Sequence, residues 1–214
     1  MIIIITKQEL DKAMDSRFSK EIHQKLKSAK VAIAGLGGLG SNVAVMLARS
    51  GIGHLHLVDF DVVDVTNLNR QVYNIEHIGI SKPEALKDII SKINPYLKIT
   101  TENICVTEEN AVSIFGEYEY VCEAFDKAEN KAMLINTILS NCNNIKIVSG
   151  SGMAGYGSSN QIKTKKIMKN LYVCGDGVSD AIEGNIGLMS PRVSICAGHE
   201  ANMIIRLILG INEE

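Results

Sequence analysis

The sequence predicts an α/β protein with a Rossmann-like, mainly parallel sheet and helices on both faces. The strand-like run KVAIAG at 30–35 leads through the glycine-rich turn GLGGLG into the helical run NVAVMLARSG. A second strand-like run, HLHLVDF at 54–60, follows that helix, so a βαβ unit with two parallel strands is expected. Runs of strand length and of helical periodicity then alternate as far as residue 150, which extends the same layered sheet.

Further elements are expected on both sides of this unit. Mixed charges and apolar positions at helical spacing over 8–28 indicate one or two helices before the first strand. Glycine-rich text and short β-like runs over 151–180 indicate hairpins or a crossing loop, and a packed final helix follows from Pro191 to about Gly210. In between, we expect helices over 82–94, 107–115 and 126–141 and strands over 97–104, 118–125 and 145–150.

The composition is typical of a soluble globular protein. Of the 214 residues, 46% are hydrophobic and 21% are charged, and the formal net charge of -2 favours neither a nucleic acid nor a disordered chain. The opening run MIIIIT is too short for a signal peptide or an anchor, and no later run approaches the roughly 20 apolar residues of a membrane span. The five cysteines lack C-x-x-C spacing. We therefore expect a cytoplasmic protein without nucleic-acid or membrane partners.

The glycine-rich turn predicts a nucleotide site. Gly35, Gly37 and Gly40 form a G-x-G-x-x-G pattern directly after a strand and before a helix, where the backbone can approach a phosphate at the helix N-terminus. Asp59 ends the next strand, where a carboxylate can bind ribose hydroxyls. The additional Gly38 indicates that something larger than a hydrogen atom lies against the turn. These features alone fit an NAD(P)-dependent oxidoreductase.

The residues after Asp59 favour a different chemistry. Asn67, Arg70 and Gln71 must lie at the same carboxyl edge of the sheet, where open α/β folds bind ligands. Lys82, at the start of the next helix, adds a second cation, and Asp126 brings a carboxylate suited to Mg²⁺. A hydride-transfer site has little need for this set. A site that holds a triphosphate and stabilises charge on it does need fixed cations.

Four segments together resemble a known enzyme family. The segments GLGGLGSN, DFDVVDVTNLNRQ, GISKPEAL and EAFD are similar to those of ThiF and MoeB proteins, which activate ubiquitin-like sulfur carriers and are related to ubiquitin-activating enzymes. The resemblance covers roughly residues 15 to 206. It implies that ATP and Mg²⁺ are bound and that the C-terminal Gly-Gly carboxylate of a small carrier attacks the α-phosphate. Pyrophosphate then leaves, and a carrier acyl-adenylate remains.

The resemblance also implies roles for individual residues. The glycine turn would face the nucleotide, Asp59 would hold the ribose, and Arg70, Lys82 and Asp126 would be catalytic, with Asp126 on the metal. Asp61 would support Arg70 or the metal shell, whereas Asp64 is more simply a cap for the following turn. The full set implied to bind ATP is Gly35, Gly37, Gly38, Gly40, Asp59, Asp61, Asn67, Arg70, Gln71, Lys82 and Arg17.

Two further sites follow from the family pattern. The segment RFSK keeps Arg17 and has Lys20 where relatives carry a second arginine, and in the family this element reaches ATP in the partner subunit of a dimer. We therefore expect a homodimer. Some relatives use a cysteine to link the carrier covalently, and Cys174, in the polar segment YVCGDG, is the thiol here in a plausibly exposed segment. A plain structural role for Cys174 is favoured.

The sequence departs from the family in lacking both C-x-x-C pairs that bind a structural zinc, so no zinc is expected. The resemblance is closest to a short, zinc-free ThiF branch of thiamine biosynthesis, through EAFDKAENKAM, SGMAGYGSSN and LMSPRVSICAGHEANMIIRL. The loop at 149–160 could form a channel for the Gly-Gly tail, although such a loop needs no ligand. Arg192 is read as a structural or carrier-facing cation rather than a catalytic one.

The chain is accordingly divided within a single domain, 1–214. Residues 1–29 form a helical arm, 30–150 the nucleotide-binding core, and 151–214 a carrier-facing loop and closing helix. Three other functions stay open: an oxidoreductase, an enzyme that adenylates a small or RNA-borne carboxylate, and a non-catalytic nucleotide-binding subunit of an activating complex.

Overall fold

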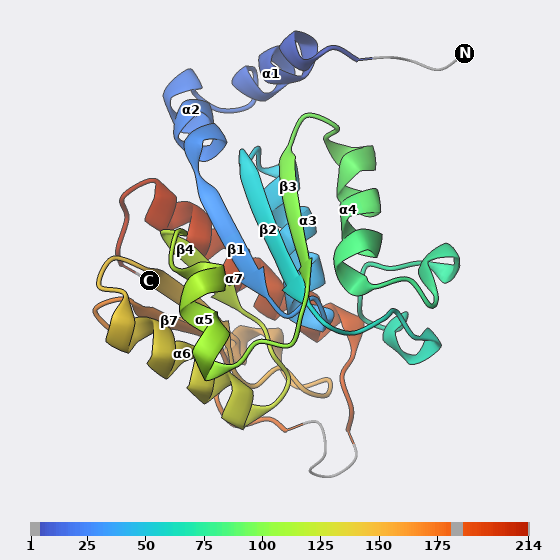
Figure 1. Ribbon diagram of the computed structural model, residues 1–214, viewed down its shortest axis with the longest axis vertical. Coiled ribbons are helices and arrows are strands. Elements are labelled where there is room, and N and C mark those ends of the chain that lie inside the picture. The colour runs from blue at the N-terminus through green and yellow to red at the C-terminus, as the bar shows by residue number, and fades with distance from the viewer. Residues whose placement is uncertain (1–4, 181–185, 214) are drawn as a thin grey trace.

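The computed structural model describes residues 5–180 and 186–213, and a seven-stranded sheet lies at its centre (Figure 1). The opening apolar run, expected to be neither signal peptide nor anchor, lies outside the described residues at positions 1–4. The strands are β1 Lys30–Ala34, β2 His54–Asp59, β3 Lys98–Asn103, β4 Tyr120–Glu123, β5 Lys146–Gly150, β6 Lys163–Met168 and β7 Leu171–Gly175.

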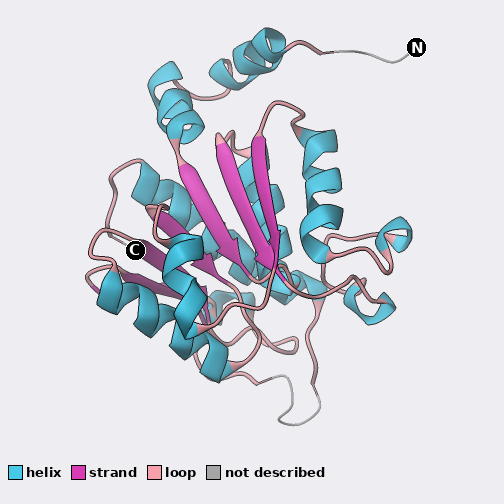
Figure 2. Cartoon of the chain, in the orientation of Figure 1, coloured by secondary structure: helices cyan, strands magenta, loops and turns pink. Residues whose placement is uncertain are grey.

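The sheet has the strand order β3-β2-β1-β4-β5-β7-β6. Every neighbouring pair is parallel except the hairpin of β6 and β7, so the predicted, mainly parallel sheet is confirmed (Figure 2). The sequence predicted a hairpin or a crossing loop after residue 150, but it did not predict that β7 inserts between β5 and β6. Because β7 pairs in parallel with β5, the C-terminal part extends the same sheet rather than forming a separate layer.

Helices cover both faces of the sheet. Leu86 and Ile204 belong to the core on one face, and Phe115 and Ile138 belong to the core on the other. In Figure 1 the second face is turned toward the viewer, with α5 and α6 in front. Proline occupies the first turn of α4 and of α7, where a missing amide costs nothing. The helices are α1 Lys7–Asp15, α2 Lys20–Ser28, α3 Gly38–Arg49, α4 Lys82–Ile93, α5 Glu108–Phe115, α6 Ala128–Asn141 and α7 Ser190–Ile208.

The N-terminal arm lies at the amino edge of the sheet. Helix α2 leads directly into β1, and α1, which has no buried residue, projects beyond it (Figure 1). The arm is held in part by buried His23, whose Nδ1 lies 2.7 Å from Asp15 Oδ1. No helix in the described part of the chain is long and apolar enough to cross a bilayer.

Candidate functional site

The glycine turn joins β1 to α3 at the carboxyl edge of the sheet, and two of its glycines are required by packing. A Cβ on Gly40 would lie 1.9 Å from the Gly35 carbonyl oxygen. Gly35 has φ +89°, and a Cβ there would lie 2.8 Å from the Ala124 carbonyl oxygen. Helix α3 begins without a side-chain cap, so its first amides remain available to a ligand.

Gly38 meets the larger groups that the sequence pattern implied. A Cβ at this position would lie 3.1 Å from Val193 Cγ1 and 3.5 Å from Arg70 Cγ. Val193 belongs to α7, so the closing helix packs against the glycine turn. The turn is therefore held between the stem of Arg70 and α7, and only Gly37 and Gly38 within it are partly exposed.

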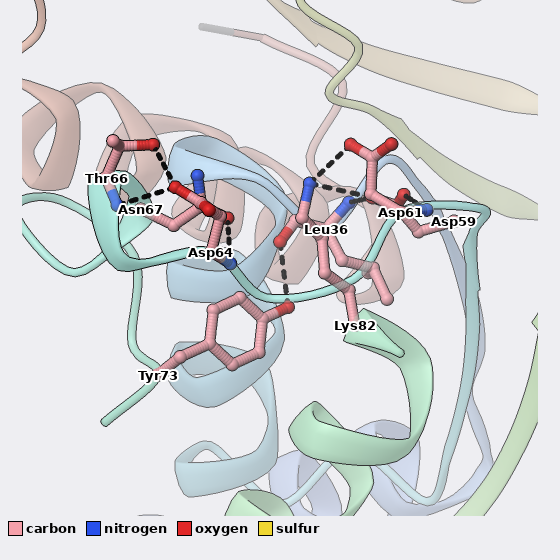
Figure 3. A network of polar contacts seen from close by, with 8 residues as sticks. All are labelled: Leu36, Asp59, Asp61, Asp64, Thr66, Asn67, Tyr73 and Lys82. Carbon is pink, nitrogen blue, oxygen red and sulfur yellow. Dashed lines mark hydrogen bonds and ion pairs between the residues drawn. The ribbon is translucent and has the colours of Figure 1, made fainter. Parts of the chain in front are cut away.

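Asp59 fastens the glycine turn to the end of β2. Its Oδ2 accepts a 2.6 Å hydrogen bond from the Leu36 amide, and its Oδ1 accepts one of 2.8 Å from the Asp61 amide (Figure 3). Tyr73 Oη donates to the Leu36 carbonyl oxygen at 2.9 Å. Burial raises the pKa of Asp59, although the nearby Lys82 opposes that shift. The carboxylate thus positions the turn, and its ribose contact stays a prediction.

Lys82 is 6% exposed and reaches across to Asp61, which follows β2. Its Nζ lies 2.6 Å from Asp61 Oδ2 and 4.0 Å from Asp59 Oδ2 (Figure 3). Of the two roles expected for Asp61, support of Arg70 is wrong for the described structure, because Lys82 engages the Asp61 carboxylate. Its place in a metal shell stays a prediction. Backbone pairing brings Asp61 and Lys82 together, and the sequence gives no sign of this pairing because the two residues are far apart along the chain.

Arg70 and Gln71 carry buried polar atoms that no described group satisfies. Arg70 Nη1 donates to the Thr66 carbonyl oxygen at 3.1 Å and to Asn69 Oδ1 at 2.7 Å, but Arg70 Nε is buried without a partner among the described residues. Gln71 Oε1 is in the same condition. An unsatisfied buried polar atom costs about 1–3 kcal/mol. The two side chains that carry these atoms border Gly37 and Gly38, so this part of the glycine turn is the candidate place for a polar ligand.

Asn67 and Asp64 shape the turn that presents Arg70 and Gln71. Asp64 Oδ1 accepts from the Thr66 amide at 2.8 Å, and Asn67 Oδ1 accepts from the Asp64 amide at 3.1 Å (Figure 3). The cap predicted at Asp64 is confirmed. Asn67 completes this capping box, so its contact with phosphate stays a prediction.

Asp126 follows β4 at the same carboxyl edge and is exposed. Within the described residues, no three His, Cys, Asp or Glu side chains are placed to hold a metal ion together. Mg²⁺ bound to a nucleotide commonly takes only one or two carboxylates, with phosphates and water completing its shell. A single exposed carboxylate, two residues after the Ala124 carbonyl that faces Gly35, fits that donor set.

Sequence reasoning missed a buried ionic group next to this edge. Glu123 is fully buried at the end of β4, where Lys131 Nζ lies 3.0 Å from Oε2 and Ser149 Oγ donates to the same oxygen at 2.5 Å. Its Oε1 accepts from the Phe125 amide at 2.8 Å, which fixes the chain just before Asp126. The only sequence signal was a charged residue ending an otherwise apolar strand.

Arg17 is not brought to the other predicted residues. It lies between α1 and α2, at the amino edge of the sheet, whereas the glycine turn and Asp59 lie at the carboxyl edge. Lys20 begins α2 on the same side. Within one chain, therefore, neither cation belongs to this site, and a contribution from a partner subunit stays a prediction.

The expectation that Cys174 lies in an exposed segment is wrong. Cys174 is fully buried on β7, its Sγ lies 3.4 Å from Thr164 Oγ1, and burial raises the pKa of its thiol to about 12. The polar text around it belongs to the turn after the strand, while the cysteine itself points into the core. Cys105 is the exposed thiol among the described cysteines.

Arg192 is a structural cation, one of the two roles considered for it. It is 5% exposed, its Nη2 lies 2.5 Å from Asp176 Oδ2, and its Nη1 donates to the Ala154 carbonyl oxygen at 3.3 Å. Asp176 Oδ1 also accepts from the Ser179 amide at 2.9 Å. The pair fastens the glycine-rich loop after β5 to the turn after β7 and to α7. Whether this loop forms a channel stays a prediction.

Comparison with known proteins places this geometry in a family. The chain is 38% identical over 130 residues to the adenylyltransferase and sulfurtransferase UBA4 of Debaryomyces hansenii, which aligns 60% of this chain and 29% of the relative. It is 33% identical over 156 residues to the tRNA threonylcarbamoyladenosine dehydratase of Escherichia coli, with 72% of this chain and 58% of the relative aligned. The chain thus spans less than two thirds of either relative.

Solved structures share the fold. The E. coli dehydratase TcdA in complex with AMP superposes with a TM-score of 0.85 at 23% identity and covers 98% of both chains. Residues 10–214 match the ThiF family. With the glycine turn, the D-x-D strand end and the cation pair at one sheet edge, this match confirms the resemblance, and the chain belongs to the ThiF family.

Proposed function

We propose that the protein is an ATP-dependent adenylyltransferase that activates the Gly-Gly C-terminus of a small ubiquitin-like sulfur carrier. The observation that carries this proposal is the unsatisfied buried donor Arg70 Nε beside an uncapped helix N-terminus. An anionic ligand with several acceptor oxygens would use the uncapped amides of α3 and the guanidinium together. Complexes of the related TcdA with AMP and with ATP support an adenine nucleotide there.

The chemistry asks little of the protein as a base. A C-terminal carboxylate is already ionised at neutral pH, so the site has only to bring it to the α-phosphate and stabilise the charge on the leaving pyrophosphate. Arg70 and Lys82 provide that stabilisation, and the amides of α3 add donors. An oxidoreductase would leave both cations without a function.

Two further residues complete the proposal. Asp126 would hold Mg²⁺, which supplies charge neutralisation on the phosphates when it is bound. Arg17, with Lys20, would act in the partner subunit of a homodimer, since it is at the wrong edge to act in its own chain. We place the carrier in thiamine biosynthesis, on the strength of the resemblance to the short zinc-free branch.

A second candidate substrate is an RNA-borne carboxylate. It is favoured by the relative named as a tRNA threonylcarbamoyladenosine dehydratase, which aligns with 72% of this chain. The same nucleotide site would serve either substrate, because only the incoming carboxylate differs.

The test is pyrophosphate exchange into ATP. The purified protein is assayed alone, with small carriers that end in Gly-Gly, with the same carriers lacking the last glycine, and with tRNA. Exchange that needs an intact Gly-Gly carrier supports the proposal, and exchange that needs tRNA supports the second candidate. Background exchange in every sample, together with tight NAD binding, would rule out both.

A further inference from the structure

The contact between Asp61 and Lys82 is built by the backbone on both sides. The Lys82 amide donates to the Asp61 carbonyl oxygen at 2.9 Å, and the Val63 amide donates to the Ile80 carbonyl oxygen at 2.8 Å. A β-bridge joins Val62 to Ser81 between them. The two side chains therefore start from paired positions, which fixes their meeting without help from a ligand.

The two partners differ sharply in exposure. The side chain of Lys82 is 7% exposed, whereas that of Asp61 is 50% exposed. Lys82 Nζ is 2.6 Å from Asp61 and 4.0 Å from Asp59, so one ammonium lies between two carboxylates. An ammonium is a compact charge with three donors on a flexible stem, and it can keep one carboxylate while it binds another anion.

Asp61 is poorly placed to be a nucleotide ligand. Its carboxylate is occupied by Lys82, and a second negative charge at the edge of the site would repel a triphosphate rather than bind it. It does not serve Arg70, whose guanidinium is held by Thr66 and Asn69. The role that the contacts of Asp61 support is to orient the Lys82 side chain.

We propose that Asp61 is a positioning residue that holds the Lys82 ammonium at the carboxyl edge in the free protein and shares it with a phosphate once ATP binds. This inference rests on the proposed function. Asp61 makes no bond to the nucleotide. It fixes the rotamer of a long side chain before the ligand arrives, which removes part of the ordering cost of binding and reaction.

The test compares Asp61→Asn, Asp61→Glu and Asp88→Asn. Asp88 is the matched control, because it lies on α4 and its Oδ2 pairs with Lys92 Nζ at 2.5 Å and His77 Nε2 at 3.3 Å, neither of which belongs to the site. In Asp61→Asn we expect kcat for pyrophosphate exchange to fall at least tenfold while the Kd for ATP changes less than threefold. The Kd changes little because the variant loses the repulsion between Asp61 and the triphosphate as well as the ordering of the Lys82 side chain. Asp61→Glu should recover part of kcat, and Asp88→Asn should match the wild type.

A second readout needs no activity. Pulsed acylation of lysines in the ATP-free protein, read residue by residue by mass spectrometry, should show Lys82 at least threefold faster in Asp61→Asn and unchanged in Asp88→Asn. Unchanged acylation, or a Kd for ATP that weakens tenfold with kcat intact, would overturn the inference. A wild type that binds no ATP would overturn the proposed function instead, and the acylation result would still report on the pair.

Discussion

The two edges of the sheet each carry an aspartate–lysine cluster, and the clusters differ in what they leave unpaired. At the amino edge, Lys27 Nζ lies 2.6 Å from Asp11 and His23 Nδ1 lies 2.7 Å from Asp15, so the charged groups of the arm satisfy one another. At the carboxyl edge, the pair of Lys82 and Asp61 stands beside buried atoms of other residues that no described group satisfies. The first cluster is therefore a structural contact, whereas the second lies next to the unsatisfied polar atoms expected of a binding site.

A cavity at the amino edge could be mistaken for the nucleotide site. A cavity of about 400 Å³ lies under α1 at the amino edge, lined in part by Leu10, Met14 and Tyr96. Helices α3 and α4 end on this side, so their negative dipole ends face it and disfavour a triphosphate. The helix N-termini, which lie at the other edge, are therefore a better guide to this site than a cavity alone.

The largest expected difference is between alanine substitutions of two glycines, Gly40 at the carboxyl edge and Gly53 at the amino edge. A Cβ on Gly40 would lie 1.9 Å from the Gly35 carbonyl oxygen, and one on Gly53 would lie 1.7 Å from the Lys27 carbonyl oxygen. Gly40→Ala should weaken ATP binding at least about 100-fold, because the turn itself must shift. Gly53→Ala should lower the free energy of unfolding and leave ATP affinity within about threefold. Urea denaturation and ATP titration of the two variants measure both quantities, and equal losses of affinity would contradict the comparison.

The next effect separates two cations. Arg70→Ala should lower kcat/KM for pyrophosphate exchange by roughly 10²–10³, the usual cost of removing a group that stabilises developing charge. Lys27→Ala removes a cation of the amino edge and should change kcat/KM less than twofold. Steady-state exchange kinetics check both variants. A loss in Lys27→Ala as large as that in Arg70→Ala would contradict the assignment of Lys27 to a structural contact of the arm.

The pH dependence of stability should have opposite signs at two carboxyl groups. Burial raises the pKa of Glu200, on α7 against Gly150, well above 4.5, so the folded state favours its neutral form. That stability is complete below pH 4.5 and is lost as pH rises toward the folded-state pKa, by about 1.4 kcal/mol per unit. Relative to wild type, Glu200→Gln should therefore gain stability as pH rises above 4.5.

Asp11 should behave in the opposite way. The hydrogen bond from Lys27 lowers the pKa of Asp11 below 3.8, so its contribution is present above pH 3.8 and is lost as pH falls. Asp11→Asn should therefore lose stability at neutral pH and converge on the wild type in acid. Urea titrations of both variants between pH 3 and pH 8 check the signs. If the stability of both variants relative to wild type changed with pH in the same direction, the predicted opposite signs would be wrong.

The smallest effect concerns the arm. The pair of Asp11 and Lys27 is partly exposed, with side-chain exposures of 34% and 41%. A double-mutant cycle with Asp11→Ala and Lys27→Ala should give a coupling free energy below about 1 kcal/mol. Denaturation of the four proteins measures it, and a coupling of several kcal/mol would show that this cluster is more than a surface fastening.

Much of the fold was readable because its signals are local. A few consecutive residues are enough to predict the glycine turn, the helix starts at Lys82 and Pro191, and the buried strand at 54–59. The parallel insertion of β7 was not readable, because pairing with β5 depends on the packing of α7 across both strands.

The residues of the candidate site could be predicted from the sequence, but the contacts between them could not. Asp61 and Lys82 were both identified, but their contact depends on a bridge between segments about 20 residues apart. Glu123 and Glu200 were missed, since a single charge in an apolar run gives no sign that it is fully buried. Cys174 was misplaced for the converse reason, because polar neighbours hid a strand residue that points into the core.

Hydrogen–deuterium exchange with and without MgATP tests the central claim most directly, because it compares both edges of the sheet in one experiment. We expect protection over 35–41, 59–71 and 82–86, with exchange over 49–53 and 94–98 unchanged and protection of 7–28 only where a partner subunit supplies Arg17 to the site. Protection confined to the amino edge, or protection of the carboxyl edge by NAD and not by ATP, would contradict it.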